Sequence, residues 1–199
     1  MFFGLFLIGG FGNVRSMISR ARWDSPVVRI RWLETIGLIV AAIVVPFLVH
    51  LIPWSGSRPA GVYLLPVFWT AFVAVYFGST FTALAVALAM PVANLVMTGL
   101  PALDWIGPMS LELVLYVMVA SLLVRLWPRV WLAGPIAYIP AKAIAIAIQT
   151  VSPVGHDGRD PLSHLLDATM NGLAGLAVLA LINLALVKLC SNSSDWDDE

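Results

Sequence analysis

The sequence predicts an all-α integral membrane protein built as a bundle of six transmembrane helices, and three observations lead to this fold class. Of the 199 residues, 60% are hydrophobic and only 11% are charged, whereas soluble domains are about 45–50% apolar and about 25% charged. Most hydrophobic residues gather in six runs, and most of these runs have the ~17–25 residues of a membrane-spanning helix. Basic residues are distributed unequally between the helix connections on the two sides of the expected membrane.

The N-terminal stretch MFFGLFLIGGFG is apolar, but it is shorter than the ~20 residues that a spanning helix needs. A signal peptide would carry its positive charge before the apolar stretch. Here Arg15, Arg20 and Arg22 follow it. We therefore interpret residues 1–32 as a cytoplasmic or interfacial segment, with Met17 as an alternative start to Met1.

The six apolar runs are separated by proline, glycine or charged residues. They lie at 33–53, 62–78, 80–99, 109–127, 130–151 and 162–189. Prolines inside the runs predict kinks, which membrane helices tolerate because neighbouring helices satisfy the freed backbone groups. We expect a transmembrane domain over 33–189, followed by an acidic cytoplasmic tail at 190–199.

The basic residues predict the orientation of the bundle. If the N-terminus is inside, only Arg58 and Arg159 fall on the outer side. The cytoplasmic side then carries Arg15, Arg20, Arg22, Arg29, Arg31, Arg125, Arg129 and Lys188. The positive-inside rule therefore places both termini in the cytoplasm.

Several classes of function are disfavoured by composition and motifs. Eleven basic residues balance eleven acidic residues, so no charge excess favours a nucleic-acid partner. The single cysteine, Cys190, excludes an internal disulfide and a cysteine-based zinc site. The sequence contains no H-E-x-x-H, G-x-S-x-G or P-loop motif. We predict no catalytic residue, metal or cofactor, and any active transport needs a partner or an existing gradient.

Polar residues inside the runs are the main functional signal, because a charge at bilayer depth costs at least about 2.5–3.5 kcal/mol. In the expected topology, nine polar residues from five helices share the outer half of the membrane. They are His50, Asn94, Thr98, Glu112, Lys142, Gln149, His164, Asp167 and Asn171. The inner half holds only Glu34 and Asn183 beyond the flanking arginines. This asymmetry predicts a polar cavity that opens outward above an apolar inner half.

Within this group, His164, Asp167 and Asn171 share one helix face at spacings of three and four. Lys142 lies too deep to reach the surface, so we expect it to pair with Asp167 or Glu112. Each polar residue also has a purely structural interpretation, such as an ion pair that only joins two helices. Trp54, Tyr63 and Trp69 add aromatic faces on which a ring could stack.

Two stretches, residues 59–101 and 108–127, carry an ordered series of proline, glycine and acidic motifs. In order, these are Leu65-Pro66, Gly78, Pro91-Val92-Ala93-Asn94, Thr98-Gly99-Leu100-Pro101 and Leu111-Glu112-Leu113. The series resembles the substrate-binding S components of energy-coupling factor (ECF) vitamin transporters, and His50 in VHLIP also fits. The resemblance covers roughly 40–127, and the last two helices match only in length and spacing.

The resemblance implies a six-helix S-component bundle in the bacterial plasma membrane that binds a vitamin or related micronutrient on its outer side. Energy would come from partner ECF transmembrane and ATPase subunits. S components often carry an A-x-x-x-A partner contact in their first helix, and here Gly37 and Ala41 are nearest to it. The predicted substrate-binding residues are His50, Tyr63, Trp69, Asn94, Glu112, Lys142, Gln149, His164, Asp167 and Asn171.

Three alternatives stay open. A solitary transporter would work without the ATPase module. A scaffold protein of the MreD cell-shape type has a similar size and helix count, and it predicts a partner-facing groove instead of a cavity. A membrane-embedded enzyme using Glu112, His164 and Asp167 predicts a water-accessible acid–base pair within about 3 Å.

Overall fold

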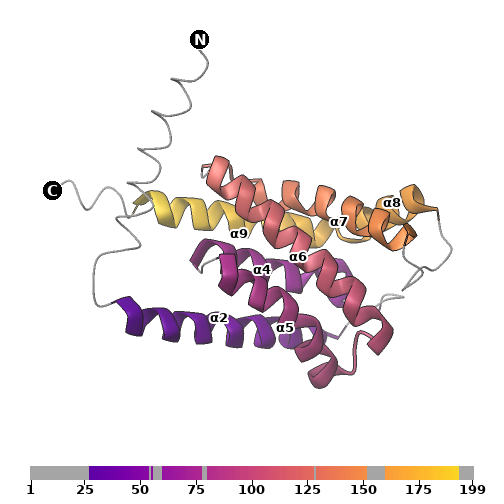
Figure 1. The fold of residues 1–199 in the computed structure, drawn as a ribbon, viewed down its shortest axis with the longest axis horizontal. Helices are drawn as coiled ribbons and strands as arrows, with labels where there is room; N and C mark the ends of the chain where they lie inside the picture. The colour runs from indigo at the N-terminus through magenta and orange to yellow at the C-terminus, as the bar shows by residue number, and fades with distance from the viewer. Residues whose placement is uncertain are drawn as a thin grey trace, which may run out of the picture. The chain divides into compact units, whose positions relative to one another are not determined.

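The computed structural model describes residues 27–53, 55, 60–77, 80–127, 129–151 and 160–192, and every element in them is an α-helix. The helices are α2 (Val27–His50), α3 (Ala60–Leu64), α4 (Pro66–Phe77), α5 (Thr80–Thr98), α6 (Leu103–Leu126), α7 (Ala133–Val151), α8 (Pro161–Asn171) and α9 (Leu173–Asn192) (Figure 1). The predicted all-α class is therefore confirmed for the described residues. The chain divides into two units, 1–36 and 37–199, and the packing below is that of the second.

Three helices are long and apolar enough to cross a membrane, namely α5, α6 and α7. The pair α8 and α9 qualifies as one further span if its 61° bend is accommodated within the bilayer. The segment Ile36–His50 and helix α4 are apolar but shorter. These helices indicate membrane association, and the predicted number of six spans goes beyond the three or four that the described residues support.

The predicted helix limits agree best where composition changes sharply. Helix α5 covers the run predicted at 80–99, and α7 ends at Val151 as predicted. Helix α6 was expected to begin at 109, after Pro108, but it begins at Leu103 and contains that proline. A proline inside a helix removes one backbone hydrogen bond, and α6 continues through the loss.

Two predictions of a single helix were wrong. The run 62–78 forms α3 and α4, which are separated at Leu65, whose φ of 52° is left-handed. The residue before a proline is disfavoured in the right-handed helical region, so Pro66 explains a break rather than a kink. The run 162–189 forms α8 and α9, which meet at Gly172 with a 61° bend.

The two breaks lie against each other. A Cβ atom built on Gly172 would lie 2.8 Å from Leu65 Cδ1, and one built on Gly175 would lie 2.5 Å from the backbone oxygen of Leu64. The indole nitrogen of Trp69 donates a hydrogen bond of 3.2 Å to the backbone oxygen of Gly175. Small residues allow this backbone approach, so the two interruptions pack closely against each other.

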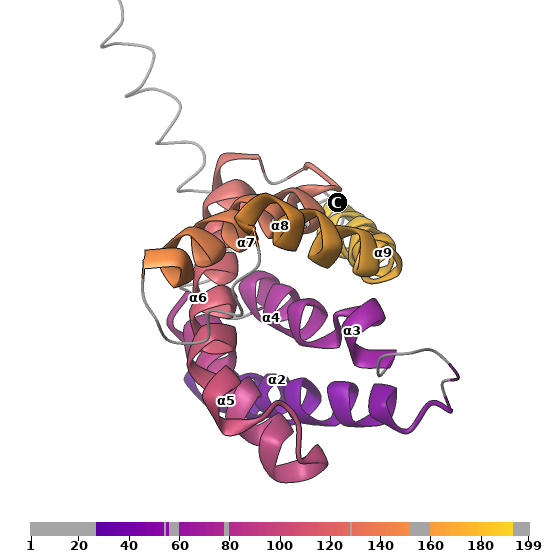
Figure 2. The same cartoon turned by 90° about the vertical axis from the view of Figure 1, so that its right-hand side faces the viewer.

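Helix α4 is the most enclosed helix of this unit, and its Phe68, Ala71, Phe72 and Ala74 are buried in the core. It packs against α5, α6 and α9, and Figure 2 shows it inside an arc formed by α5, α6, α7 and α9. Helix α6 packs extensively against both α5 and α7. The α6–α7 pair therefore forms one wall of the bundle.

One end of the bundle is held by polar contacts. The hydroxyl of Tyr76 donates to Asn183 Oδ1 over 3.2 Å, and Asn183 Nδ2 donates to the backbone oxygen of Val130 over 3.3 Å. Arg125 Nη2 donates to Thr80 Oγ1 over 2.5 Å. These contacts bring together the ends of α4 and α6, the starts of α5 and α7, and α9. Asn183, which the sequence placed in the apolar inner half, is fully buried there.

Candidate functional site

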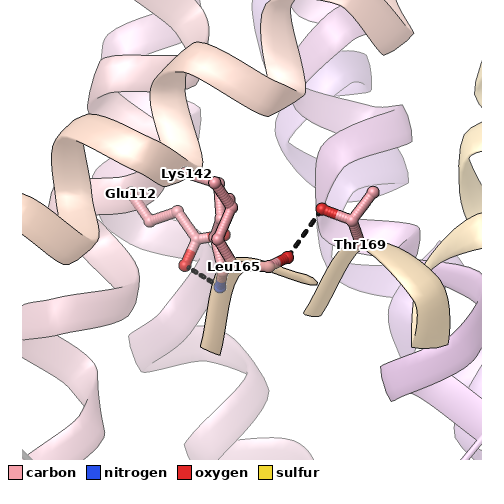
Figure 3. Close-up of polar contacts among 4 residues, drawn as sticks. All are labelled: Glu112, Lys142, Leu165 and Thr169. Atoms are coloured by element: carbon pink, nitrogen blue, oxygen red, sulfur yellow. Dashed lines mark hydrogen bonds and ion pairs between the residues drawn. The ribbon is translucent and has the colours of Figure 1, made fainter. Parts of the chain in front are cut away.

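An ion pair joins α6 to α7. Lys142 Nζ lies 2.6 Å from Glu112 Oε2, and the two side chains are only 16% and 11% exposed, respectively (Figure 3). The expectation that Lys142 pairs with Asp167 or Glu112 is thus confirmed, with Glu112 as the partner. Both residues lie in helices that could span a membrane. The pair therefore places two opposite charges between two candidate membrane spans.

Aromatic residues lie one helical turn from the ion pair, toward the α6–α7 connection. Tyr116 follows Glu112 by four residues on α6, and Tyr138 precedes Lys142 by four on α7. The ring of Phe68 makes edge-to-face contacts with both tyrosines, with centroid distances of 5.0 Å. Both tyrosines are buried, so an aromatic cluster of Phe68, Tyr116 and Tyr138 closes one side of the ion pair.

The Tyr116 hydroxyl is buried and makes no hydrogen bond within the described part of the chain. Leaving a buried hydroxyl unpaired costs about 1–3 kcal/mol. We therefore expect Tyr116→Phe to leave the thermal stability unchanged or to raise the free energy of unfolding by about 1 kcal/mol. Thermal unfolding of the detergent-solubilised protein measures this change.

Tyr76→Phe is the matched control for that substitution, because its hydroxyl donates to buried Asn183. Hydrogen bonds between membrane helices average about 0.6 kcal/mol, so this variant should be less stable than the parent. An equal loss of stability in both variants would show that the Tyr116 hydroxyl has a partner after all.

Helix α8 carries three of the predicted site residues and packs against α7. Asp160 caps the helix by accepting from the Ser163 backbone nitrogen at 3.0 Å. Asp167 is exposed, and Asn171 Nδ2 donates to the backbone oxygen of Asp167, not to its carboxylate, over 2.7 Å. His164 is half-buried. Figure 3 draws Leu165 and Thr169 of α8 in the same close-up as the ion pair, and Thr169 Oγ1 donates to the Leu165 oxygen over 2.8 Å.

Three predicted residues lie at the end of α2 or close to the break at Leu65. His50 Nδ1 is 2.7 Å from the Pro46 oxygen, and a Cβ on Gly61 would lie 2.9 Å from His50 Cε1. His50 thus packs the end of α2 onto α3. Tyr63 is half-buried on α3. Trp69 is half-buried and donates its indole hydrogen bond to the Gly175 oxygen.

The remaining predicted residues are dispersed. Asn94 and Gln149 are half-buried on α5 and α7, and the Asn94 backbone oxygen accepts from Thr98 Oγ1 at 2.8 Å. The proposed partner contacts Gly37 and Ala41 are exposed on α2. Trp54 lies outside the described residues. The structure therefore joins Glu112 to Lys142 directly and distributes the other predicted residues over the surrounding helices.

The predicted site did not include Phe68, Tyr116 or Tyr138, although it included the aromatic residues Tyr63 and Trp69. A tyrosine four residues from each buried charge was an available signal, since residues at that spacing share a helix face. Among the described residues, no group of three or more histidine, cysteine or acidic side chains could hold a metal ion.

The ion pair keeps unused hydrogen-bonding capacity. An ammonium group has three donors and a carboxylate has two acceptor oxygens, and the contact between Lys142 Nζ and Glu112 Oε2 uses one of each. A solute with its own donor and acceptor could therefore bind both side chains. Comparison of the chain with protein-family models, with curated proteins and with solved structures finds no match.

Proposed function

We propose that this protein is the substrate-binding subunit of a membrane transporter of the ECF S-component type. It would bind a small vitamin-like solute at Glu112 and Lys142, on the outer side of a six-helix bundle in the bacterial plasma membrane. Uptake would draw its energy from partner transmembrane and ATPase subunits. The observation that carries this proposal is the Glu112–Lys142 ion pair between two candidate membrane spans.

The cost of such a pair favours a functional role. Replacing a buried ion pair by apolar residues of similar volume is often neutral or stabilising, so two leucines would join α6 and α7 at least as well. Ionisable residues inside membrane spans mark substrate or ion pathways in many transporters. Interrupted helices supply polar backbone groups to binding sites in several transporter folds, and this bundle has breaks at Leu65 and Gly172.

The charges of the pair favour a zwitterionic or amide-bearing solute. Such a solute presents an acceptor to Lys142 and a donor to Glu112, and it leaves neither charge unpaired. Helix α8 packs on α7. We expect the face of α8 that carries His164, Asp167 and Asn171 to lie nearest to an entering solute. The resemblance to S components supports the same solute size and the same location.

Native mass spectrometry of the gently purified protein tests this proposal. A bound molecule of vitamin-like mass should be present in the parent protein and absent from Glu112→Gln, which removes the charge but keeps the shape. Asp104→Asn is the matched control, because Asp104 is an exposed acid in the first turn of the same helix. Full retention of the mass by Glu112→Gln would refute the assigned site.

A further inference from the structure

The α6–α7 turn presents basic and aromatic side chains together. Trp127 and Trp131 are 58% and 48% exposed, and they flank the exposed Arg129 in sequence. Arg125 is exposed on the last turn of α6. Exposed indoles are costly in water but favourable at the headgroup level of a membrane, where the ring is half solvated.

Other aromatic residues share this end of the bundle. Phe77 ends α4 and Phe81 lies in the first turn of α5, and both are exposed. The hydrogen bond from Arg125 to Thr80 places the start of α5 beside the end of α6. We refer to this surface as the basic–aromatic end, consisting of Phe77, Phe81, Arg125, Trp127, Arg129 and Trp131.

Among the described residues, two exposed acids lie at the opposite end. Asp104 lies in the first turn of α6, and Asp160 caps the start of α8. Both are exposed. Within the described part of this unit, the arginines lie only at the basic–aromatic end. The described helices therefore carry a charge difference along the bundle, which suits a membrane whose cytoplasmic leaflet is anionic.

An exposed apolar stripe runs along α6 toward the end that carries Arg125 and Arg129. Met118, Leu122 and Leu126 follow one another at a spacing of four residues, and each has more than half of its surface exposed. Side chains at this spacing lie above one another on one helix face. The stripe ends where Arg125, Trp127 and Arg129 begin. Such a surface suits an amphiphile. Its anionic headgroup would meet the arginines, and its acyl chain would meet the apolar stripe.

We propose that the basic–aromatic end is a binding site for an anionic phospholipid. Arg125 and Arg129 bind the headgroup phosphate between Trp127 and Trp131, and an acyl chain lies along Met118, Leu122 and Leu126. Guanidinium groups suit this role because their planar donor arrays match phosphate oxygens. The stripe favours a lipid over a free phosphate ion, which would have no contact with it. This site does not depend on the proposed transport function.

Nanodiscs of two compositions test the lipid site, one of phosphatidylcholine alone and one containing phosphatidylglycerol as well. The full chain should retain phosphatidylglycerol preferentially in native mass spectrometry and should melt at a higher temperature in its presence. Arg129→Gln should reduce the preference about fivefold, as expected for one basic residue near an anionic surface. Equal retention of both lipids by the parent, or an unchanged preference in Arg129→Gln, would overturn the proposal.

Two controls separate charge from structure. Thr80→Val removes the hydrogen bond to Arg125 without changing the charge, so the lipid preference should persist. Inorganic phosphate added to the phosphatidylcholine nanodiscs should leave the melting temperature unchanged. A rise equal to that caused by phosphatidylglycerol would identify a phosphate-ion site instead and would overturn the assignment to lipid.

Discussion

Lys142→Ala is expected to lower the free energy of unfolding by about 3 kcal/mol, because it leaves the Glu112 carboxylate buried without its partner. The two side chains are only 16% and 11% exposed, so water can replace little of the lost interaction. The same variant should lose any solute that the parent retains. Chemical or thermal unfolding in a fixed detergent measures the first effect, and native mass spectrometry measures the second.

The double substitution Glu112→Leu with Lys142→Leu separates stability from binding. Removing both charges leaves no unpaired group, so its stability should return to within about 1 kcal/mol of the parent. Solute retention should remain absent, because no charged group is left to recognise it. If the double variant were as unstable as Lys142→Ala, the loss would come from altered packing of α6 on α7 and not from an unpaired charge.

Gly175→Ala is expected to destabilise the bundle by about 1–3 kcal/mol, the usual cost of inserting a methyl group into a packed interior. The new Cβ would lie 2.5 Å from the Leu64 oxygen and 2.6 Å from the Leu64 carbonyl carbon. Backbone atoms cannot rotate away as the end of a side chain can, so α9 and α3 must separate. The hydrogen bond from Trp69 to the Gly175 oxygen would weaken with that separation.

Substitutions at two other glycines serve as comparisons for Gly175→Ala. Gly37 on α2 has open space around a Cβ position, so Gly37→Ala should be neutral or stabilising, since alanine has the higher helix propensity. At Gly172 the nearest atom is the end of the Leu65 side chain at 2.8 Å, which predicts an intermediate effect. Tryptophan fluorescence should report the movement of Trp69 only in the variants at the crossing. Equal effects at Gly175 and Gly37 would contradict the tight crossing.

The sequence predicted those features that depend on composition along the chain. The limits of α5 and the end of α7 followed from changes between apolar and polar residues. The break at Gly172 was missed because the run 162–189 was interpreted as one span, although the Asn171-Gly172 dipeptide is a turn signal. At Leu65 the proline was recognised, but whether it kinks or interrupts the helix depends on how α9 packs against it.

The candidate site was also predicted only in part, because some of its features depend on local sequence and others on tertiary packing. The cost of a buried charge was enough to predict that Lys142 has an acidic partner. The choice of Glu112 over Asp167 depends on the rotation of α6 and α8 about their axes, which the sequence pattern leaves open. Equal depth also did not imply contact. Asn94 was expected in the same outer half of the membrane as the pair, yet it lies on α5, whereas the pair joins α6 to α7.

The crossing at Gly172 and Leu65 has a mechanical consequence. The bend between α8 and α9 lies at Gly172, and the break between α3 and α4 lies at Leu65. Because these two junctions are in contact, a change in the bend between α8 and α9 would press on the break between α3 and α4. Two interruptions that are distant in sequence therefore support one another through a single contact.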